Sequence, residues 1–375
     1  MAAIREFSFD GKELEIFWED ASHSRLQAIW LRDNCQMPSS RDPHSGQRLL
    51  NITDIPLNIG IRDVRLENGK LVVEFKPDGH RSEFDLDWLY RNCYCLNSQH
   101  DDRSEASKIL WHGKSFGRSL PRQKYSAFCS RRRSKLAALQ AVRDYGFVLL
   151  DSVPCESGKV LEAIREFGYP RETNYGPMFE VRARIDANNL AFTNLGLGCH
   201  LDNPYRDPVP GLQLLHCLES SVEGGETLLQ DGFMAAKILR DENPGHFATL
   251  SQNWINFRFR DSSADLRARA PMIEVNDLDE VVKLRYNNRS IDTVKLPPNR
   301  LQDFYPAYRQ LAEILQRKEL QLEFKLQAGE LILFDNTRVL HARRAYSSAG
   351  NRHLQGAYSD LDGLYSCLRM LEAAQ

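Results

Sequence analysis

Hydrophobic and polar positions divide the chain into three regions. Over residues 61–84, IRDVRLENGKLVVEFKPDGHRSEF, two alternating apolar and polar runs flank Asn68-Gly69. An Asn-Gly pair tolerates the positive φ angles of a two-residue turn, so this stretch predicts a β-hairpin. The next region is polar and weakly periodic, which is typical of a linker. We therefore predict a small β-rich amino-terminal domain at 1–100, a linker at 101–133 and a larger domain at 134–375.

The larger region opens with helical periodicity and continues with short apolar runs. A first helix is expected after the cap Ser134 and ends at Gly146, and a second follows the cap Ser157. A third covers 301–315, with Pro306 in its first turns. Strands are expected at Phe147–Leu150, Gly211–Leu218, Thr227–Gln230, Trp254–Phe259, Met272–Val275, Val281–Tyr286, Leu331–Phe334 and Gln355–Ser359. So many strands without helical crossovers favour an antiparallel jelly roll with flanking helices, a mainly β fold.

Composition and charge narrow the classes of function. Basic residues number 49 and acidic residues 51, a formal net charge of -2. This balance offers no global field for nucleic acid or an acidic membrane, and the run Arg131–Arg133 is typical of a solvated face. No signal peptide or membrane-spanning run is readable, and the eight cysteines lack the spacing of a disulfide framework. We therefore expect a cytoplasmic protein with reduced thiols.

Two segments contain residues that bind metals. In GLGCHLDNPYRDPVPG, His200 and Asp202 are separated by one residue, so in an extended strand both side chains point to the same face. His-x-Asp alone is common by chance, and a structural histidine is the alternative. Downstream, GELILFDNTRVLHARRAY ends an apolar strand before His341, a third ligand returning from the opposite side of a barrel. Two histidines and a carboxylate leave positions open, as in non-haem Fe(II) oxygenases, whereas zinc more often takes a closed set with thiolates.

An iron site of this type needs a co-substrate that supplies electrons. Arg352 begins RHLQGAYSD, eleven residues after His341, and its guanidinium can hold a carboxylate in a bidentate pair. Thr227 in GGETLLQDG can donate a hydroxyl hydrogen bond to the same anion. The alternatives are a surface ion pair for Arg352 and an ordinary strand position for Thr227. Taken together with the three metal ligands, Thr227 and Arg352 favour a site for a dicarboxylate.

The same segments carry a family resemblance. TNLGLGCHLDNPYRDPVPGLQLLHCLESSVEGGETLLQDGF, GELILFDNTRVLHARRAY and RHLQGAYSDLDGLYSCLRML resemble the γ-butyrobetaine hydroxylase group of the taurine-dioxygenase-like Fe(II)- and 2-oxoglutarate-dependent oxygenases. WLRDNCQMPSSRDPHSGQRL and DGHRSEFDLDWL extend the resemblance to the amino-terminal region. It implies a double-stranded β-helix, Fe(II) held by His200, Asp202 and His341, 2-oxoglutarate held by Arg352 and Thr227, O₂ as the second co-substrate, and usually a homodimer.

The resemblance also raises the question of zinc in the amino-terminal domain. Relatives often bind a zinc ion there through three closely spaced cysteines and a later histidine. Cys35 and His80 match that pattern, but Met37 and Ser40 stand where the other thiols would be. A thioether and a neutral hydroxyl are poor zinc ligands, so we expect this site to be degenerate and the zinc to be lost. Cys93, Cys95 and His44 are the candidates that could substitute.

Substrates of the resembling family are small zwitterions with a trimethylammonium group. Such a cation donates no hydrogen bond and is bound by ring faces through cation–π attraction. The family's cage positions are all aromatic in this chain: Tyr175, Phe179, Phe192 and Tyr358. Core packing is the alternative for these rings. At the anionic end, the resemblance implies that Asn189 and Asn287 donate amides to a substrate carboxylate.

Arg289 is the feature that sets this chain apart. It stands in YNNRSID where γ-butyrobetaine hydroxylases have a small neutral residue, and a guanidinium suits the charge and three oxygens of a phosphonate. Alternatively, Arg289 pairs with Asp292 outside the pocket. Our leading hypothesis is hydroxylation of 2-(trimethylammonio)ethylphosphonate at the carbon next to phosphorus, which gives succinate and CO₂ from 2-oxoglutarate. The alternatives are γ-butyrobetaine hydroxylation to carnitine, a non-catalytic quaternary-ammonium-binding protein and, more remotely, a zinc hydrolase.

Overall fold

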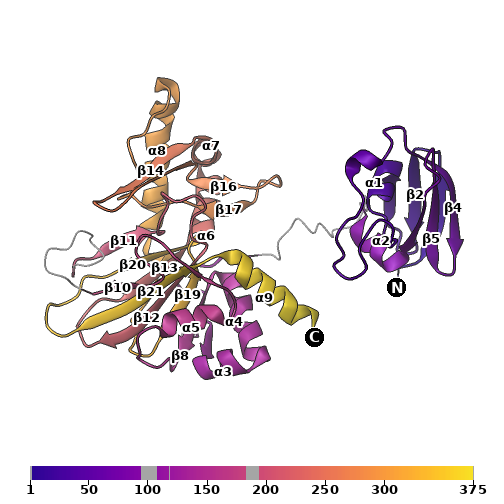
Figure 1. The fold of residues 1–375 in the computed structure, drawn as a ribbon. Helices are drawn as coiled ribbons and strands as arrows, with labels where there is room; N and C mark the ends of the chain where they lie inside the picture. The colour runs from indigo at the N-terminus through magenta and orange to yellow at the C-terminus, as the bar shows by residue number, and fades with distance from the viewer. Residues whose placement is uncertain (1, 94–107, 118, 183–193, 375) are drawn as a thin grey trace. The chain divides into compact units, whose positions relative to one another are not determined.

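The computed structural model describes residues 2–93, 108–117, 119–182 and 194–374. Contacts within the chain define two compact units, Met1–Ser104 and Glu105–Gln375. Each unit is described by itself below (Figure 1). Among the helices of the described ranges, none is both long and apolar enough to cross a membrane.

The amino-terminal unit contains two antiparallel sheets of three strands each. The first consists of β1 (Ile4–Phe9), β2 (Glu13–Trp18) and β3 (His23–Gln27), and the second of β4 (Gly60–Glu67), β5 (Lys70–Lys76) and β6 (Arg81–Asp85). Asn68 and Gly69 join β4 to β5 with φ angles of 51° and 75°, which confirms the predicted hairpin turn. Both sheets and the helices α1 (Ala28–Asp33) and α2 (Leu86–Asn92) contribute apolar side chains to one core.

Two sheets form the centre of the larger unit. The order of the first is β10-β21-β12-β19-β8-β7, with β9 also paired to β21, and that of the second is β11-β20-β13-β18. Apolar side chains of both sheets share one core, which includes Phe147, Leu229 and Phe334. This arrangement confirms the predicted mainly β fold, a double-stranded β-helix with flanking helices. The strands are β7 (Arg122–Lys124), β8 (Phe147–Asp151), β9 (Pro170–Arg171), β10 (Phe179–Val181), β11 (Leu197–His200), β12 (Leu212–Ser220), β13 (Thr227–Asp231), β18 (Leu322–Phe324), β19 (Leu331–Asp335), β20 (Val339–Arg343) and β21 (Arg352–Ser359).

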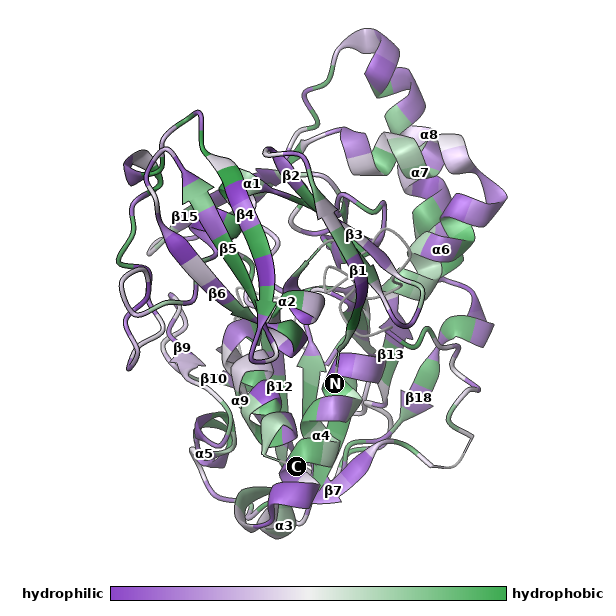
Figure 2. Ribbon diagram, turned by 90° about the vertical axis from the view of Figure 1, so that its right-hand side faces the viewer, coloured by the Kyte–Doolittle hydropathy of each residue, from purple (hydrophilic) through white to green (hydrophobic). Residues whose placement is uncertain are grey.

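Helices flank this centre in two groups. One group, α3 (Tyr125–Ser130), α4 (Arg132–Tyr145), α5 (Lys159–Arg165) and α9 (Leu361–Ala373), packs on the first sheet. In Figure 2, α4 and α9 carry both hydrophobic and hydrophilic residues, as helices with one buried face do. The second group, α6 (Gly232–Glu242), α7 (Pro244–Gln252) and α8 (Pro298–Leu315), shares a core with the hairpins β14 (Ile255–Arg260)–β15 (Asp265–Ala270) and β16 (Ile273–Val275)–β17 (Val281–Leu284).

Every strand predicted in the larger region is present, but three predictions about helices were wrong. α4 follows Arg131 rather than a Ser134 cap, because the Ser134 hydroxyl donates to Gln123 Oε1 at 3.0 Å. α5 follows Gly158 rather than Ser157, whose hydroxyl accepts a hydrogen bond from Gln355. Pro306 lies inside α8 rather than in its first turns, because the helix already begins at Pro298, where a missing N–H costs nothing.

The expected linker also contains regular structure. Within 101–133, β7 joins the first sheet by pairing in parallel with β8, and α3 packs in the core on that sheet. The two compact units meet in sequence at Ser104. Most of the polar segment therefore contributes to the larger unit. The sequence did not predict these elements, because β7 has three residues and α3 has six, which is too short for a clear hydrophobic periodicity.

Candidate metal centre and cavity

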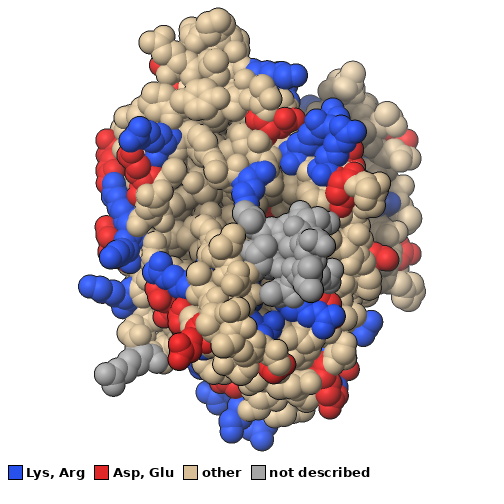
Figure 3. All heavy atoms as spheres, turned by 90° about the vertical axis from the view of Figure 1, so that its left-hand side faces the viewer, with Lys and Arg blue, Asp and Glu red and all other residues tan. Residues whose placement is uncertain are grey.

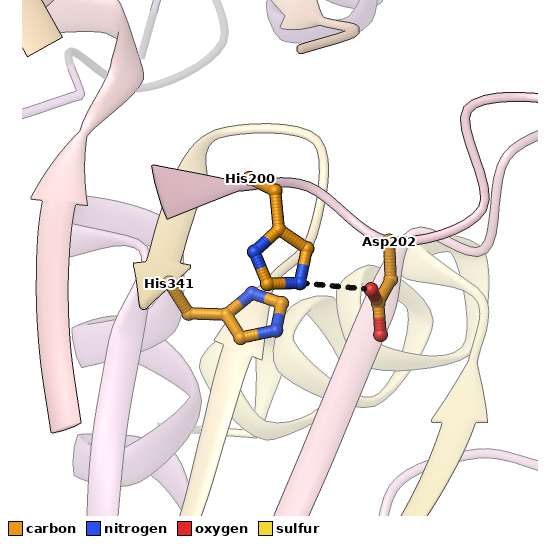
Figure 4. A group of neighbouring side chains, drawn as sticks. All are labelled: His200, Asp202 and His341. Atoms are coloured by element: carbon orange, nitrogen blue, oxygen red, sulfur yellow. Dashed lines mark ion pairs between the residues drawn. The ribbon is translucent and has the colours of Figure 1, made fainter. Parts of the chain in front are cut away.

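Three side chains that bind metals lie together at the ends of neighbouring strands. His200, the last residue of β11, pairs directly with His341 of β20, and their ring centroids are 4.2 Å apart. Asp202 follows in the loop after β11 (Figure 4). One ligand atom from each of the three lies within 4.8 Å of the others. Two details of the prediction were wrong: β11 ends before Asp202, and His341 comes from the adjacent strand rather than from the opposite side of a barrel.

Hydrogen bonds orient His200 and Asp202. The Nδ1–H of His200 donates to the Gly198 carbonyl at 2.8 Å, so Nε2 is left to face Asp202 Oδ1, 3.4 Å away (Figure 4). The fully buried Asn336 holds the backbone of Asp202 from both sides. Its Oδ1 accepts from the Asp202 N–H at 2.8 Å, and its Nδ2 donates to the Asp202 carbonyl at 2.9 Å. The carboxylate is thereby fixed relative to the imidazole.

The protonation states of this cluster suit a metal cation. Burial lowers the pKa of His341 to about 3, with a further contribution from the neighbouring His200, so its imidazole is neutral at pH 7. Burial alone would raise the pKa of Asp202, but the adjacent imidazoles of His200 and His341 and the hydrogen bond from the Tyr358 hydroxyl outweigh burial and lower that pKa. A neutral imidazole and an ionised carboxylate are the forms that coordinate metals.

The donor set fits Fe(II). Two imidazole nitrogens and one carboxylate oxygen form the facial set that leaves positions open for other ligands. His341 Nδ1 is buried without a hydrogen-bond partner among the described residues. The adjacent Cys199 does not add a thiolate, because burial raises the pKa of its thiol to about 12 and the side chain packs in the core around α6 and α8. With Fe(II) bound, the centre supplies the site where O₂ and 2-oxoglutarate react.

The metal cluster lines a cavity of about 490 Å³. The residues expected to bind 2-oxoglutarate line the same cavity. Arg352 begins β21 and Thr227 begins β13. Arg352 Nη1 is buried without a hydrogen-bond partner in the part of the chain that the structure describes. Burial lowers the pKa of this guanidinium, a sign of an unfavourable environment for its charge. An anionic ligand would compensate for that cost. Arg343, which the sequence reasoning missed, also lines the cavity.

Aromatic rings form another wall of the cavity. Tyr175, Phe179 and Tyr358 all line it, and Phe179 stacks on Tyr358 with ring centroids 5.1 Å apart. Two rings that sequence reasoning missed extend this wall: Tyr205 stacks on Phe259 at 5.2 Å, and Phe259 meets Tyr175 edge to face at 6.0 Å. Tyr205 follows Asp202 closely in sequence, but Phe259 comes from the hairpin β14–β15, and no local motif relates it to the metal ligands.

Asn189 and Phe192, the remaining predicted substrate residues of the 183–193 segment, lie outside the described residues. Asn287 lines the cavity, but its side chain is already engaged: Nδ2 donates to the Leu201 carbonyl at 3.1 Å and Oδ1 accepts from the Arg289 N–H at 3.1 Å. Asn287 therefore shapes the turn that carries Arg289. Arg289 lines the cavity, and among the described residues no ion pair joins it to Asp292.

Among its described residues, the amino-terminal unit contains no comparable cluster. Cys35 is fully buried, and its Sγ lies 3.2 Å from His80 Nε2. Of the proposed substitutes, Cys93 contacts the Ser24 hydroxyl, His44 is exposed, and Cys95 lies outside the described residues. Within the described ranges, His200, Asp202 and His341 are the one group of three or more such side chains close enough to share a metal.

The charge pattern on one face agrees with the composition. Basic and acidic side chains alternate over the face shown in Figure 3, without a continuous basic surface among its described residues. This face therefore offers no basic patch for nucleic acid, in line with the formal net charge of -2.

Comparisons with known proteins agree with the fold and the cluster. Residues 113–358 match the family of taurine catabolism dioxygenase TauD, TfdA, and residues 5–90 match the gamma-butyrobetaine hydroxylase-like amino-terminal region. The fold and the His-Asp-His cluster define an Fe(II)- and 2-oxoglutarate-dependent dioxygenase, for which O₂ is the other co-substrate. More particularly, the chain belongs to the TauD/TfdA dioxygenase family and to its gamma-butyrobetaine hydroxylase-like group.

Curated relatives cover nearly the whole chain. A gamma-butyrobetaine dioxygenase from Pseudomonas sp. (strain AK-1) is 34% identical over 361 residues, 96% of this chain and 94% of that protein. The gamma-butyrobetaine dioxygenase of Homo sapiens is 32% identical over 375 residues, 97% of this chain and 96% of that protein. The mitochondrial trimethyllysine dioxygenase of Rattus norvegicus is 31% identical over 356 residues, 92% of this chain and 83% of that protein.

Proposed function

We propose that the enzyme hydroxylates a small zwitterion with a trimethylammonium group at one end and an acidic group at the other. The observation that carries this proposal is one cavity in which the metal cluster, Arg352 with Thr227, an aromatic wall and Arg289 all take part. His200, Asp202 and His341 hold Fe(II), and Arg352 with Thr227 hold 2-oxoglutarate. Rings attract the cationic end, and a substrate fixed at both ends presents one methylene to the metal.

γ-Butyrobetaine, hydroxylated to carnitine, is the first candidate substrate. Two relatives named gamma-butyrobetaine dioxygenase align with at least 96% of this chain. The substrate's carboxylate is a monoanion that amide donors can hold. We assign this role to Asn189 and to the second Nδ2–H of Asn287, since its first donates to the Leu201 carbonyl. A homodimer and a cytoplasmic location remain predictions for this enzyme.

2-(Trimethylammonio)ethylphosphonate, hydroxylated next to phosphorus, is the second candidate. Arg289 favours it because the residue lines the cavity without an ion pair to Asp292 among the described residues. A guanidinium matches a phosphonate better than a carboxylate, since the phosphonate offers three oxygens and up to two charges. A phosphonate would therefore gain more from Arg289 than a carboxylate would.

Succinate formation with each substrate tests the proposal and separates the candidates. Both trimethylammonium compounds are compared with their unmethylated amines, and a cage for a quaternary cation predicts preference for the methylated forms. Equal rates with the amines would contradict the aromatic wall as the cation site. A non-catalytic binding protein is tested separately: anaerobic Fe(II) with 2-oxoglutarate gives a visible charge-transfer band in the enzyme and none in a silent protein.

Arg289→Ala decides between the anionic groups. If phosphonate is the substrate, the variant loses about 2–4 kcal/mol of transition-state stabilisation, a roughly thirty-fold to several hundred-fold fall in kcat/KM. Turnover of γ-butyrobetaine changes far less. Equal losses with both substrates would show that Arg289 is structural and would favour the carnitine-forming reaction.

A further inference from the structure

The two oxygens of the Asp202 carboxylate have different surroundings. Oδ2 accepts two hydrogen bonds, from Gln213 Nε2 at 2.9 Å and from the Tyr358 hydroxyl at 2.8 Å. Oδ1 instead faces His200 Nε2. Neither donor was expected from sequence to touch a metal ligand. The two donors therefore make the two carboxylate oxygens inequivalent before any metal is bound.

The two donors occupy matched positions in the first sheet. Gln213 of β12 and Tyr358 of β21 are direct cross-strand partners, and both side chains line the cavity. Gln213 is 1% exposed and Tyr358 is 4% exposed, so neither hydrogen bond competes with bulk water. Because both donors stand on paired strands inside a sheet, their separation is fixed, and one carboxylate oxygen can meet both.

Tyr358 also belongs to the aromatic wall. Its ring stacks on Phe179, while its hydroxyl reaches Asp202. A cation that rests against this ring is thus one side chain away from a metal ligand. Removal of the hydroxyl alone separates the two contacts, since phenylalanine keeps the ring.

We propose that Gln213 and Tyr358 are positioning residues that hold Asp202 as a ligand through Oδ1 alone, and that Tyr358 links the aromatic wall to the metal centre. With Oδ2 occupied by two donors, the carboxylate offers one oxygen and leaves the remaining coordination positions for 2-oxoglutarate and O₂. The inference rests on the proposed roles of Asp202 as a metal ligand and of the aromatic wall as the cation site. Loss of either donor leaves Oδ2 with a single hydrogen bond and holds the carboxylate less firmly.

Metal affinity measured without substrate tests the first part. Co(II) binding is followed by visible absorption in the wild type, Tyr358→Phe, Gln213→Leu and the control Tyr125→Phe, which removes a tyrosine hydroxyl in α3, away from the cavity. We expect each loss of a donor to weaken binding roughly tenfold to a hundredfold, the range for partners of metal ligands, and Tyr125→Phe to bind as the wild type does. Wild-type affinity in both donor variants would overturn the proposal. If Tyr358→Phe does not fold, the Co(II) affinity of Gln213→Leu tests the proposal by itself.

The ratio of hydroxylated product to succinate tests the link between wall and metal. Tyr358→Phe should form more succinate per product than the wild type, whereas a merely structural role would leave this ratio unchanged. An unchanged ratio would overturn the link. Failure of the proposed function looks different: the wild type itself would then bind no Co(II) or form no succinate with the trimethylammonium compounds, which would overturn both proposals.

Discussion

The metal centre and the Cys35–His80 contact are both places where metal-binding side chains meet, but they are built differently. At the centre, polar atoms of two of the three ligands are bound outside the cluster: His200 Nδ1 to Gly198, and Asp202 Oδ2 to Gln213 and Tyr358. At the amino-terminal contact, Cys35 Sγ and His80 Nε2 lie 3.2 Å apart and satisfy each other. The first arrangement leaves ligand atoms directed at a common point, and the second leaves none.

The amino-terminal contact is stable without a metal for an electrostatic reason. Burial lowers the pKa of His80, and the nearby Arg32 guanidinium lowers it further, so the imidazole is neutral at pH 7. Arg32 is held by Asp78, 3.0 Å from its Nε. The comparison teaches that two neighbouring ligands do not make a metal site. A third ligand and outer contacts that direct the free atoms are also required.

Loss of a metal ligand should have the largest effect on activity. It should also distinguish the metal centre from the Cys35–His80 contact most clearly. His341→Ala, like His200→Ala and Asp202→Ala, should abolish O₂-dependent turnover and Co(II) binding in a folded protein, because an open set of three tolerates little loss. Oxygen consumption and visible absorption measure both. His80→Ala is the matched control and should retain metal binding and turnover. Full activity in the His341 variant would refute the assignment.

Arg352→Ala should have the next largest effect, confined to 2-oxoglutarate. Removing one partner of a buried charge pair costs on the order of 3 kcal/mol or more, which corresponds to at least a hundredfold rise in the KM for 2-oxoglutarate. Arg352→Lys keeps the charge without the bidentate geometry and should lose less. Steady-state kinetics at saturating substrate measure this change. An unchanged KM in the alanine variant would contradict the assignment.

His216 is a fully buried imidazole that has neither a metal cluster nor a thiol partner among the described residues. Both ring nitrogens lack hydrogen-bond partners among the described residues, and burial lowers the pKa of His216 to about 4. As pH falls below the unfolded-state value of about 6.5, the unfolded chain binds a proton that the folded protein does not, so stability falls until about pH 4. Between pH 7 and 5 the loss is about 2 kcal/mol.

Urea unfolding at pH 7 and pH 5 checks this expectation. The isosteric variant His216→Leu should lose less stability than the wild type over that interval, because leucine does not titrate. An equal loss in both proteins would show that other groups govern the acid sensitivity.

The smallest expected effect concerns the Cys35–His80 contact itself. Protein loaded with Fe(II) and Zn(II) should contain about one metal ion per chain, and Cys35→Ser should contain the same amount. Elemental analysis after gel filtration measures this ratio. A second tightly bound ion that disappears in Cys35→Ser would show that the amino-terminal unit retains a metal site and would remove the contrast between the two places.

Much of the fold could be predicted because local patterns and tertiary structure agree. The Asn68-Gly69 hairpin and the apolar strands of the larger unit follow from turn chemistry and periodicity. Helix starts could not be predicted in this way. Ser134 and Ser157 are suitable caps by residue type, yet distant Gln123 and Gln355 bind their hydroxyls. A cap competes with every other partner that folding brings near.

The sequence by itself determined the chemical inventory of the site: two histidines, an aspartate, a candidate anion-binding arginine and several aromatic residues. Only the tertiary structure decided which atoms of these groups are free. Cross-strand pairing puts His200 beside His341, and Gln213 beside Tyr358 under the same carboxylate. It also brings Phe259 from a distant hairpin to Tyr175 and Tyr205. These contacts join residues far apart in the chain, so no local spacing specifies them, and their geometry arises from strand register and core packing.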